Sequence, residues 1–217
     1  MGCFLIVMLG WVFSVCLHEY GHAIVAYHGG DTSVEEKGYL TLNPLHYGHP
    51  VLSLVLPLIY LVMGGLGLPG GAVYIEEARI RSKGWLAAVS LAGPAMNVLL
   101  GFLIWIPLRY NLLPNPDGVI AYSLAFLYEL QITAVLFNLL PVPPLDGFNF
   151  VRHWLPWPVR DWLTENGNSL FMILIMIFVM NRVISDGFNY VVFSIIDWTG
   201  VSPALAWEGW QAFRFWT

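Results

Sequence analysis

The sequence predicts an all-α protein that crosses a membrane several times, and three observations support this fold class. Of the 217 residues, 58% are hydrophobic and only 11% are charged, whereas a soluble domain carries roughly 25% charged residues. The mean hydropathy is +0.68. The apolar residues also gather in long runs that are separated by short segments rich in Gly, Pro and Asn, as in membrane proteins with several spans.

About five to six membrane segments are expected, within one domain that covers residues 1–217. The first apolar run, residues 3–28, is long enough to cross about 30 Å of hydrocarbon. The further runs expected to cross are residues 85–108, 119–140 and 170–184. A last apolar run, residues 188–198, is too short to cross comfortably.

Two regions near the first run are harder to assign. Residues 51–68 are apolar, but Pro57 and several glycines interrupt them, so this run either crosses or re-enters. Residues 39–42 and 72–75 alternate like strands, which predicts a short β-hairpin. The fold class therefore includes a re-entrant or short β-hairpin element beside the functional site.

The domain is expected to have a core at residues 3–150, followed by C-terminal segments at 151–217. A tryptophan-rich stretch, residues 152–168, reads as interfacial, and residues 198–216 as a tail that lies on the membrane. The net charge of −5 argues against a nucleic-acid partner, which would call for a basic stripe. Cys3 and Cys16 read as buried small hydrophobic residues.

An H-E-x-x-H motif lies inside the first apolar run, at His18, Glu19 and His22. Residues four apart share one face of a helix, so both imidazoles can reach one metal ion while Glu19 lies beside it as a base. Two core histidines satisfied by hydrogen bonds are the alternative. A membrane span is an expensive place for them without a purpose.

A catalytic zinc site usually has three protein ligands and an open position for water. Asp146 is the best candidate for the third ligand, because it is ionisable and follows a long apolar run and two prolines. A carboxylate there is costly without a partner, and a metal ion would supply one. The alternative is an ordinary turn, since Asp-Gly is a common turn dipeptide.

Three motifs together resemble the site-2 protease family of intramembrane zinc metalloproteases. They are His18-Glu-Tyr-Gly-His22, Ala92-Gly-Pro-Ala-Met-Asn97 and Phe137-Asn-Leu-Leu-Pro-Val-Pro-Pro-Leu-Asp-Gly147. The match covers roughly residues 12–150 and indicates a short member without an added soluble domain. One loop departs from the family pattern N-P-x-x-H-x-D-P, since it carries Tyr47 and His49 where His and Asp are usual.

The resemblance implies one zinc ion per chain, held by His18, His22 and Asp146. It also implies that Glu19 activates water and that Asn138 holds the substrate or the developing oxyanion. The implied reaction is hydrolysis of a peptide bond within or next to a transmembrane segment of another protein. The expected partners are that substrate, the lipid bilayer and, if cleavage is regulated, a membrane regulator. A membrane metal-binding or scaffold protein is the alternative, although neither needs a base such as Glu19.

Other polar residues keep two interpretations. Asn97 either bonds across helices or takes part in catalysis, and the first is at least as well supported. Glu129 and Gln131 either face a wet cavity or make structural hydrogen bonds. Surface or loop roles are the default for the remaining histidines, His28, His46, His49 and His153.

The positions of the ligands constrain the topology. For His22 and Asp146 to meet, an even number of crossings must separate their helices, which favours re-entry of residues 51–68. The basic residues then expected on the active-site face are Lys37, Arg79, Arg81, Lys83, Arg152 and Arg160, with Arg109 and Arg182 opposite. By the positive-inside rule the active site faces the cytoplasm, in the expected setting of a multi-pass protein of a prokaryotic cell membrane.

Overall fold

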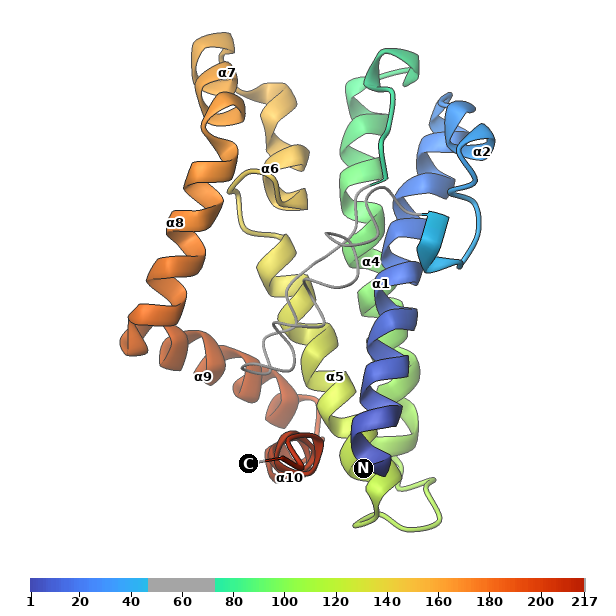
Figure 1. The fold of residues 1–217 in the computed structure, drawn as a ribbon, viewed down its shortest axis with the longest axis vertical. Helices are drawn as coiled ribbons and strands as arrows, with labels where there is room; N and C mark the ends of the chain where they lie inside the picture. Colours follow the sequence, from blue (N-terminus) through green and yellow to red (C-terminus); the bar gives the residue numbers. More distant parts are fainter. Residues whose placement is uncertain (47–72, 217) are drawn as a thin grey trace.

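Three long apolar helices form the centre of the molecule in the computed structural model, which describes residues 1–46 and 73–216. They are α1 (Gly2–Gly29), α4 (Lys83–Arg109) and α5 (Val119–Asn138), and each is long and apolar enough to cross a membrane. Each packs against the other two (Figure 1). The first three expected crossings, residues 3–28, 85–108 and 119–140, are therefore confirmed as helices of sufficient length.

Shorter elements complete the described chain. Before α4 these are α2 (Ser33–Glu36), η1 (Pro44–His46) and η3 (Glu77–Arg79). After α5 come α6 (Asp146–Val151), η4 (Arg152–Trp154), α7 (Trp157–Glu165), α8 (Gly167–Met180), α9 (Arg182–Trp198) and α10 (Pro203–Phe213).

The long helices alternate in direction. A Cβ at Gly29, at the end of α1, would lie 3.4 Å from Trp85 at the start of α4. A Cβ at Gly2, at the start of α1, would lie 3.4 Å from Val119 at the start of α5. The end of α1, the start of α4 and the end of α5 therefore point toward the same end, which we call the site end of the bundle (Figure 1). The start of α1, the end of α4 and the start of α5 form the opposite end.

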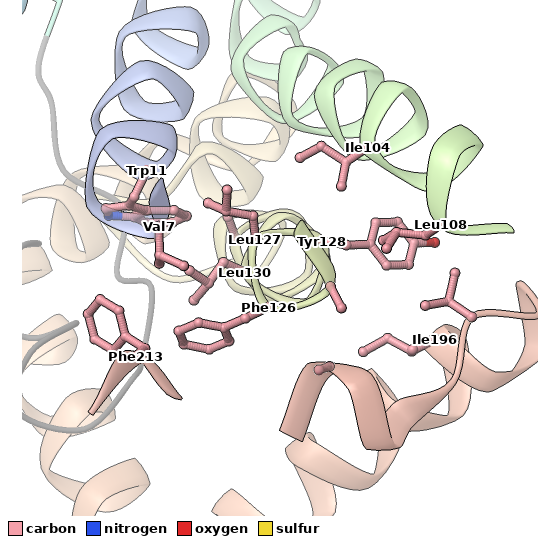
Figure 2. Packing of buried hydrophobic residues seen from close by; sticks show 14 of the residues in the cluster. Val7, Trp11, Ile104, Leu108, Phe126, Leu127, Tyr128, Leu130, Ile196 and Phe213 are labelled. Atoms are coloured by element: carbon pink, nitrogen blue, oxygen red, sulfur yellow. The ribbon is translucent and has the colours of Figure 1, made fainter. Parts of the chain in front are cut away.

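The main apolar core surrounds α5. Phe126 and Leu130 of α5 are fully buried, as are Trp11 of α1 and Phe213 of α10. Figure 2 looks along α5 and shows these side chains converging on it from several helices. Because lipid is as apolar as these side chains, close packing between the helices contributes more to their association than removal from water does.

The C-terminal stretch is more than an interfacial tail. The described part contains α10, whose Ala206, Gly209 and Phe213 are buried against the core. A Cβ at Gly209 would lie 2.1 Å from the carbonyl oxygen of Tyr122, so the glycine permits the close approach of α10 to α5. Cys3 at the start of α1 donates its S–H to the Gly209 carbonyl. The tail is thus built into the bundle.

The expected crossing at residues 170–184 is divided into two helices. Helix α8 ends at Met180, and Asn181 caps the next helix, α9, by accepting from the N–H groups of Val183 and Ile184. The side-chain oxygen satisfies N–H groups that have no partner inside the new helix. Helix α8 is apolar but has only 14 residues, so the described chain contains three long apolar helices and one shorter one, fewer than the five to six segments expected.

The prediction of strands is wrong for the part of the chain that the structure describes. Tyr39 has no regular structure, residues 40–42 are bends, and residues 73–76 have no regular structure either. Their alternation has a different cause: Tyr39 packs into a small core with Cys16 and Ala23 of α1, next to the partly buried Val73 and Ile75. The expected re-entrant run, residues 51–68, lies outside the described residues.

Candidate metal centre

His18 and His22 stand one turn apart on α1 and turn their rings toward one point. Their Nε2 atoms are 3.1 Å apart, and both side chains are buried. This arrangement follows from the i, i+4 spacing of the motif, which puts both residues on one face of the helix.

Asp146 meets this pair from another part of the chain. It is the first residue of α6, and its Oδ2 lies 3.2 Å from Nε2 of His18, while its Oδ1 lies 3.4 Å from Nε2 of His22. Gly147 allows this approach, because a Cβ there would collide with the backbone of Leu139 at the end of α5. The chain after α5 can therefore fold back tightly enough to bring the carboxylate to the histidines.

The donor set fits a zinc ion. Ligands at 2.0–2.1 Å in a tetrahedral arrangement are about 3.3–3.4 Å from one another. The two Nε2 atoms are 3.1 Å apart, and each lies 3.2 or 3.4 Å from its nearer Asp146 oxygen. The Oδ2 atom of Asp146 is buried and accepts no hydrogen bond from the described residues, which is costly unless a cation compensates. His18, His22 and Asp146 are the group of described residues that can hold a metal ion.

The outer nitrogen of each imidazole has its own partner. Nδ1 of His22 is 2.7 Å from the carbonyl oxygen of Val89, and Nδ1 of His18 is 2.5 Å from Oδ1 of Asn97. Both partners belong to α4. A carbonyl oxygen can only accept, so His22 carries its proton on Nδ1 and turns the lone pair of Nε2 inward, as a metal ligand must.

Two glycines allow α4 to lie close to the metal motif. A Cβ at Gly21, between the two histidines, would lie 2.8 Å from the carbonyl oxygen of Ala92. A Cβ at Gly93 would lie 2.2 Å from Nε2 of His22 and 2.5 Å from Nε2 of His18. The glycines of the first two motifs thus leave space between the helices and beside the imidazole nitrogens.

Glu19 lies beside the histidines with its carboxylate held by backbone. Its side chain is buried, and Oε2 accepts a hydrogen bond of 3.1 Å from the N–H of Val73. This N–H belongs to residues 73–76, which we call the strap. Sequence reasoning placed Glu19 beside the metal but did not find its contact with the strap, because the two residues are 54 positions apart.

The strap is anchored to the segment after α1. Buried Asp31 accepts from the N–H of Glu76 at 2.7 Å, and Lys37 forms an ion pair with the Glu76 side chain at 2.9 Å. The hydrogen bond from Lys37 lowers the pKa of the Glu76 carboxyl. Just beyond the strap, Glu77 pairs with Arg152 next to α6. The strap is thus linked to the segments that carry both halves of the site.

The other predicted residues lie as follows. Asn138 is buried at the last turn of α5, and no hydrogen bond in the described part of the chain joins its side chain to the metal cluster. Gln131 makes the structural hydrogen bonds described below. Glu129 has a buried Oε2 without a hydrogen-bond partner among the described residues. His28 and His46 are exposed, and His49 lies outside the described residues.

The sequence is similar to that of known proteins over its whole length. It is 40% identical to a protein of Mycolicibacterium smegmatis named "Putative zinc metalloprotease Rip2", over 100% of this chain and 83% of that protein. The chain belongs to the site-2 protease family of zinc metalloproteases. A Mycobacterium tuberculosis protein of the same name is 38% identical over 100% of this chain and 82% of its own length.

A more distant relative of this site-2 protease is also described as a zinc metalloprotease. The "Putative zinc metalloprotease YwhC" of Bacillus subtilis is 29% identical over 77% of each chain. No family model matches the sequence, and no solved structure matches it. These relatives confirm the family that the three motifs indicated, and they confirm that the chain is a zinc metalloprotease.

Proposed function

We propose that this protein is an intramembrane zinc endopeptidase that cuts a peptide bond within or next to a transmembrane segment of another membrane protein. One observation carries the proposal. The buried residues His18, Glu19 and His22 lie inside an apolar helix of 28 residues and meet Asp146 there. A site at that depth favours substrates that are themselves embedded in the membrane.

The chemistry rests on four residues. His18, His22 and Asp146 would hold zinc, which supplies Lewis acidity and makes water a stronger nucleophile at neutral pH. Glu19 accepts a proton from the attacking water and returns it to the leaving amine. The N–H of Val73 fixes one oxygen of Glu19, so the base is oriented before the substrate arrives. The amide of Asn138 is the proposed donor to the oxygen that becomes negative.

The decisive experiment compares Glu19→Gln with the wild type in proteoliposomes that contain a reporter transmembrane substrate. Glu19→Gln should retain zinc and lose cleavage by a factor of at least about 10², because only the base is removed. Asp146→Ala should lose zinc as well as cleavage. Cleavage by Glu19→Gln at the wild-type rate would refute the assigned base, and wild-type zinc content in Asp146→Ala would refute the third ligand.

A membrane metal-binding or scaffold protein is the second candidate. A His-His-Asp cluster with both histidines buried is by itself compatible with it. The position of Glu19 favours the enzyme, because a scaffold has no use for a carboxylate beside the metal that a backbone N–H holds in place. Under this alternative, wild type and Glu19→Gln would bind zinc equally and neither would cleave the reporter.

The setting of the protein is part of the proposal. We expect a multi-pass protein of a prokaryotic cell membrane whose site end faces the cytoplasm, with a membrane-protein substrate and, where cleavage is controlled, a membrane regulator as partners. Support comes from the three long apolar helices and from the basic residues at the site end, Lys37, Arg79, Arg81, Lys83, Arg152 and Arg160.

A further inference from the structure

A small polar cluster is buried between the three long helices next to His18. It consists of Ser14 of α1, Asn97 of α4 and Gln131 of α5, each at most 3% exposed. Ser14 lies one turn before His18 on the same helix. Polar groups in such a place are costly unless they are fully bonded, and here hydrogen bonds join all three.

The hydrogen bonds of this cluster have a direction, which a backbone carbonyl sets. The side-chain nitrogen Nε2 of Gln131 donates to the carbonyl oxygen of Leu127 at 3.3 Å. That oxygen can only accept, so the amide of Gln131 is oriented with Oε1 toward the other two residues. Oε1 then accepts from the hydroxyl of Ser14 at 2.7 Å and from Nδ2 of Asn97 at 2.9 Å.

This orientation is passed on to Asn97. Its Nδ2 donates both to Gln131 and to Oγ of Ser14, the latter at 3.0 Å, so both amide protons are used. The Oδ1 atom is left facing Nδ1 of His18 at 2.5 Å. Because Oδ1 can only accept, the proton of the neutral imidazole must be on Nδ1. The lone pair of Nε2 then faces His22 and Asp146.

We propose that Ser14, Asn97 and Gln131 form a relay that sets the tautomer of His18, with Ser14 and Gln131 as positioning residues for the metal site. His22 needs no such relay, because its Nδ1 bonds directly to the carbonyl of Val89. The inference rests on the proposed metal site for its purpose. The tautomer itself is a property of the metal-free protein.

A purely structural role makes a different prediction. If the cluster only joins helices, its loss lowers stability and leaves the tautomer of His18 unchanged. Replacing Gln131 by leucine separates the two readings. Asn97 would still contact Ser14 and His18, but a hydroxyl both donates and accepts, so nothing would fix the orientation of the Asn97 amide.

The experiment is ¹⁵N NMR of the metal-free protein in nanodiscs, labelled with [¹⁵N]histidine, at a mildly alkaline pH where free imidazole is neutral. Wild type should show His18 as a single Nδ1–H tautomer, assigned by its loss in His18→Gln. Gln131→Leu should show a mixture of both tautomers. Thr133→Val, which alters another buried polar residue of α5, is the matched control and should resemble wild type.

Zinc affinity, measured by competition with a chromophoric chelator, gives the size of the effect. Gln131→Leu should bind zinc about 10- to 100-fold more weakly, the usual effect of losing a partner of a metal-bound histidine. A single wild-type tautomer in Gln131→Leu overturns the proposal. If Gln131→Leu does not fold, Ser14→Ala takes its place, and the same unchanged spectrum there overturns it. Failure of wild type to bind zinc would refute the proposed function while the spectra still decide the relay.

Discussion

Gly93 shows how one missing side chain shapes the candidate site. It lies on α4 directly opposite the two imidazoles, where a Cβ would come within 2.5 Å of both Nε2 atoms. Real non-bonded contacts to carbon are about 3.5–4.0 Å, so any side chain at this position must displace the histidines or the helix. The glycine of the A-G-P motif is therefore explained by the space that the inward-facing nitrogens need.

Gly93→Ala should consequently impair metal binding. We expect zinc affinity to fall by at least about tenfold, a loss comparable to that of disrupted metal-site support, and cleavage to fall with it. Chelator competition on the purified protein measures the affinity. Gly84→Ala is the matched control, because Gly84 begins the same helix and a Cβ there would meet only the Ser82 hydroxyl at 3.7 Å. Equal zinc affinities for the two variants would contradict this account.

The metal cluster could be predicted from sequence because each member follows from a local rule. Helical spacing pairs His18 with His22, and the cost of a lone carboxylate after an apolar run singles out Asp146. The bond from Asn97 to His18 could not be predicted in this way. This hydrogen bond depends on how far α4 is shifted along α1. That shift results from the packing of many side chains between the two helices.

The strap, residues 73–76, contacts Glu19 and can also offer its backbone to a substrate. Residues 73–76 hold Glu19 through the N–H of Val73, and they form neither helix nor strand in the described chain. A segment beside the proposed base that belongs to no helix can pair with a substrate segment that has unwound, by adding an edge. The sequence predicted strands at residues 72–75 and 39–42, but residues 40–42 of the second segment are bends.

Tyr74→Pro tests the pairing. Proline removes one backbone N–H and keeps the preceding residue extended, so zinc should be retained while cleavage falls severalfold. Tyr74→Ala is the control at the same position, since it removes the largely exposed ring and keeps the N–H. Initial rates on the reporter substrate and zinc content are the measurements. Equal rates for the two variants would argue against strand addition here.

Helix α10 was harder to predict than the long helices. Its apolar and tryptophan-rich sequence also suits a helix on a membrane surface. Ala206 and Gly209 are the small residues in it that favour close packing against another helix. The division of residues 170–184 into α8 and α9 at Asn181 was also difficult to predict. An apolar run predicts a helix, but a single capping side chain within it is enough to begin a new one.

Gly209→Ala tests the docking of α10. A Cβ there would overlap the Tyr122 carbonyl, and overpacking of this kind costs about 1–3 kcal/mol. Gly187→Ala is the control on α9, since its Cβ would meet nothing within 4 Å, and removing a helical glycine there should stabilise by about 0.5–1 kcal/mol. Thermal unfolding in detergent should therefore shift in opposite directions. A higher melting temperature for Gly209→Ala would contradict the packing.

At the scale of the whole molecule, the two ends of the bundle differ in their number of basic residues. Six basic residues belong to the site end. At the opposite end Arg109 ends α4, Arg182 begins α9 and Arg214 follows α10 (Figure 1). The described residues on either side of positions 47–72 both lie at the site end, since Val73 bonds to Glu19 and His46 contacts Gly38. The chain thus leaves and returns at the same end, as the meeting of His22 with Asp146 requires.

This arrangement predicts which residues can be reached from each side of the membrane. Because basic residues are retained in the cytoplasm, a cysteine at Arg160 in α7 should react with a membrane-impermeant maleimide only after the cells are opened. A cysteine at Arg109 should react in intact cells. Both native cysteines, Cys3 and Cys16, are buried, so the background should be low. The reverse pattern would place the site end outside the cell. Labelling of both positions in intact cells would contradict the assignment of α5, which lies between them in the chain, as a span.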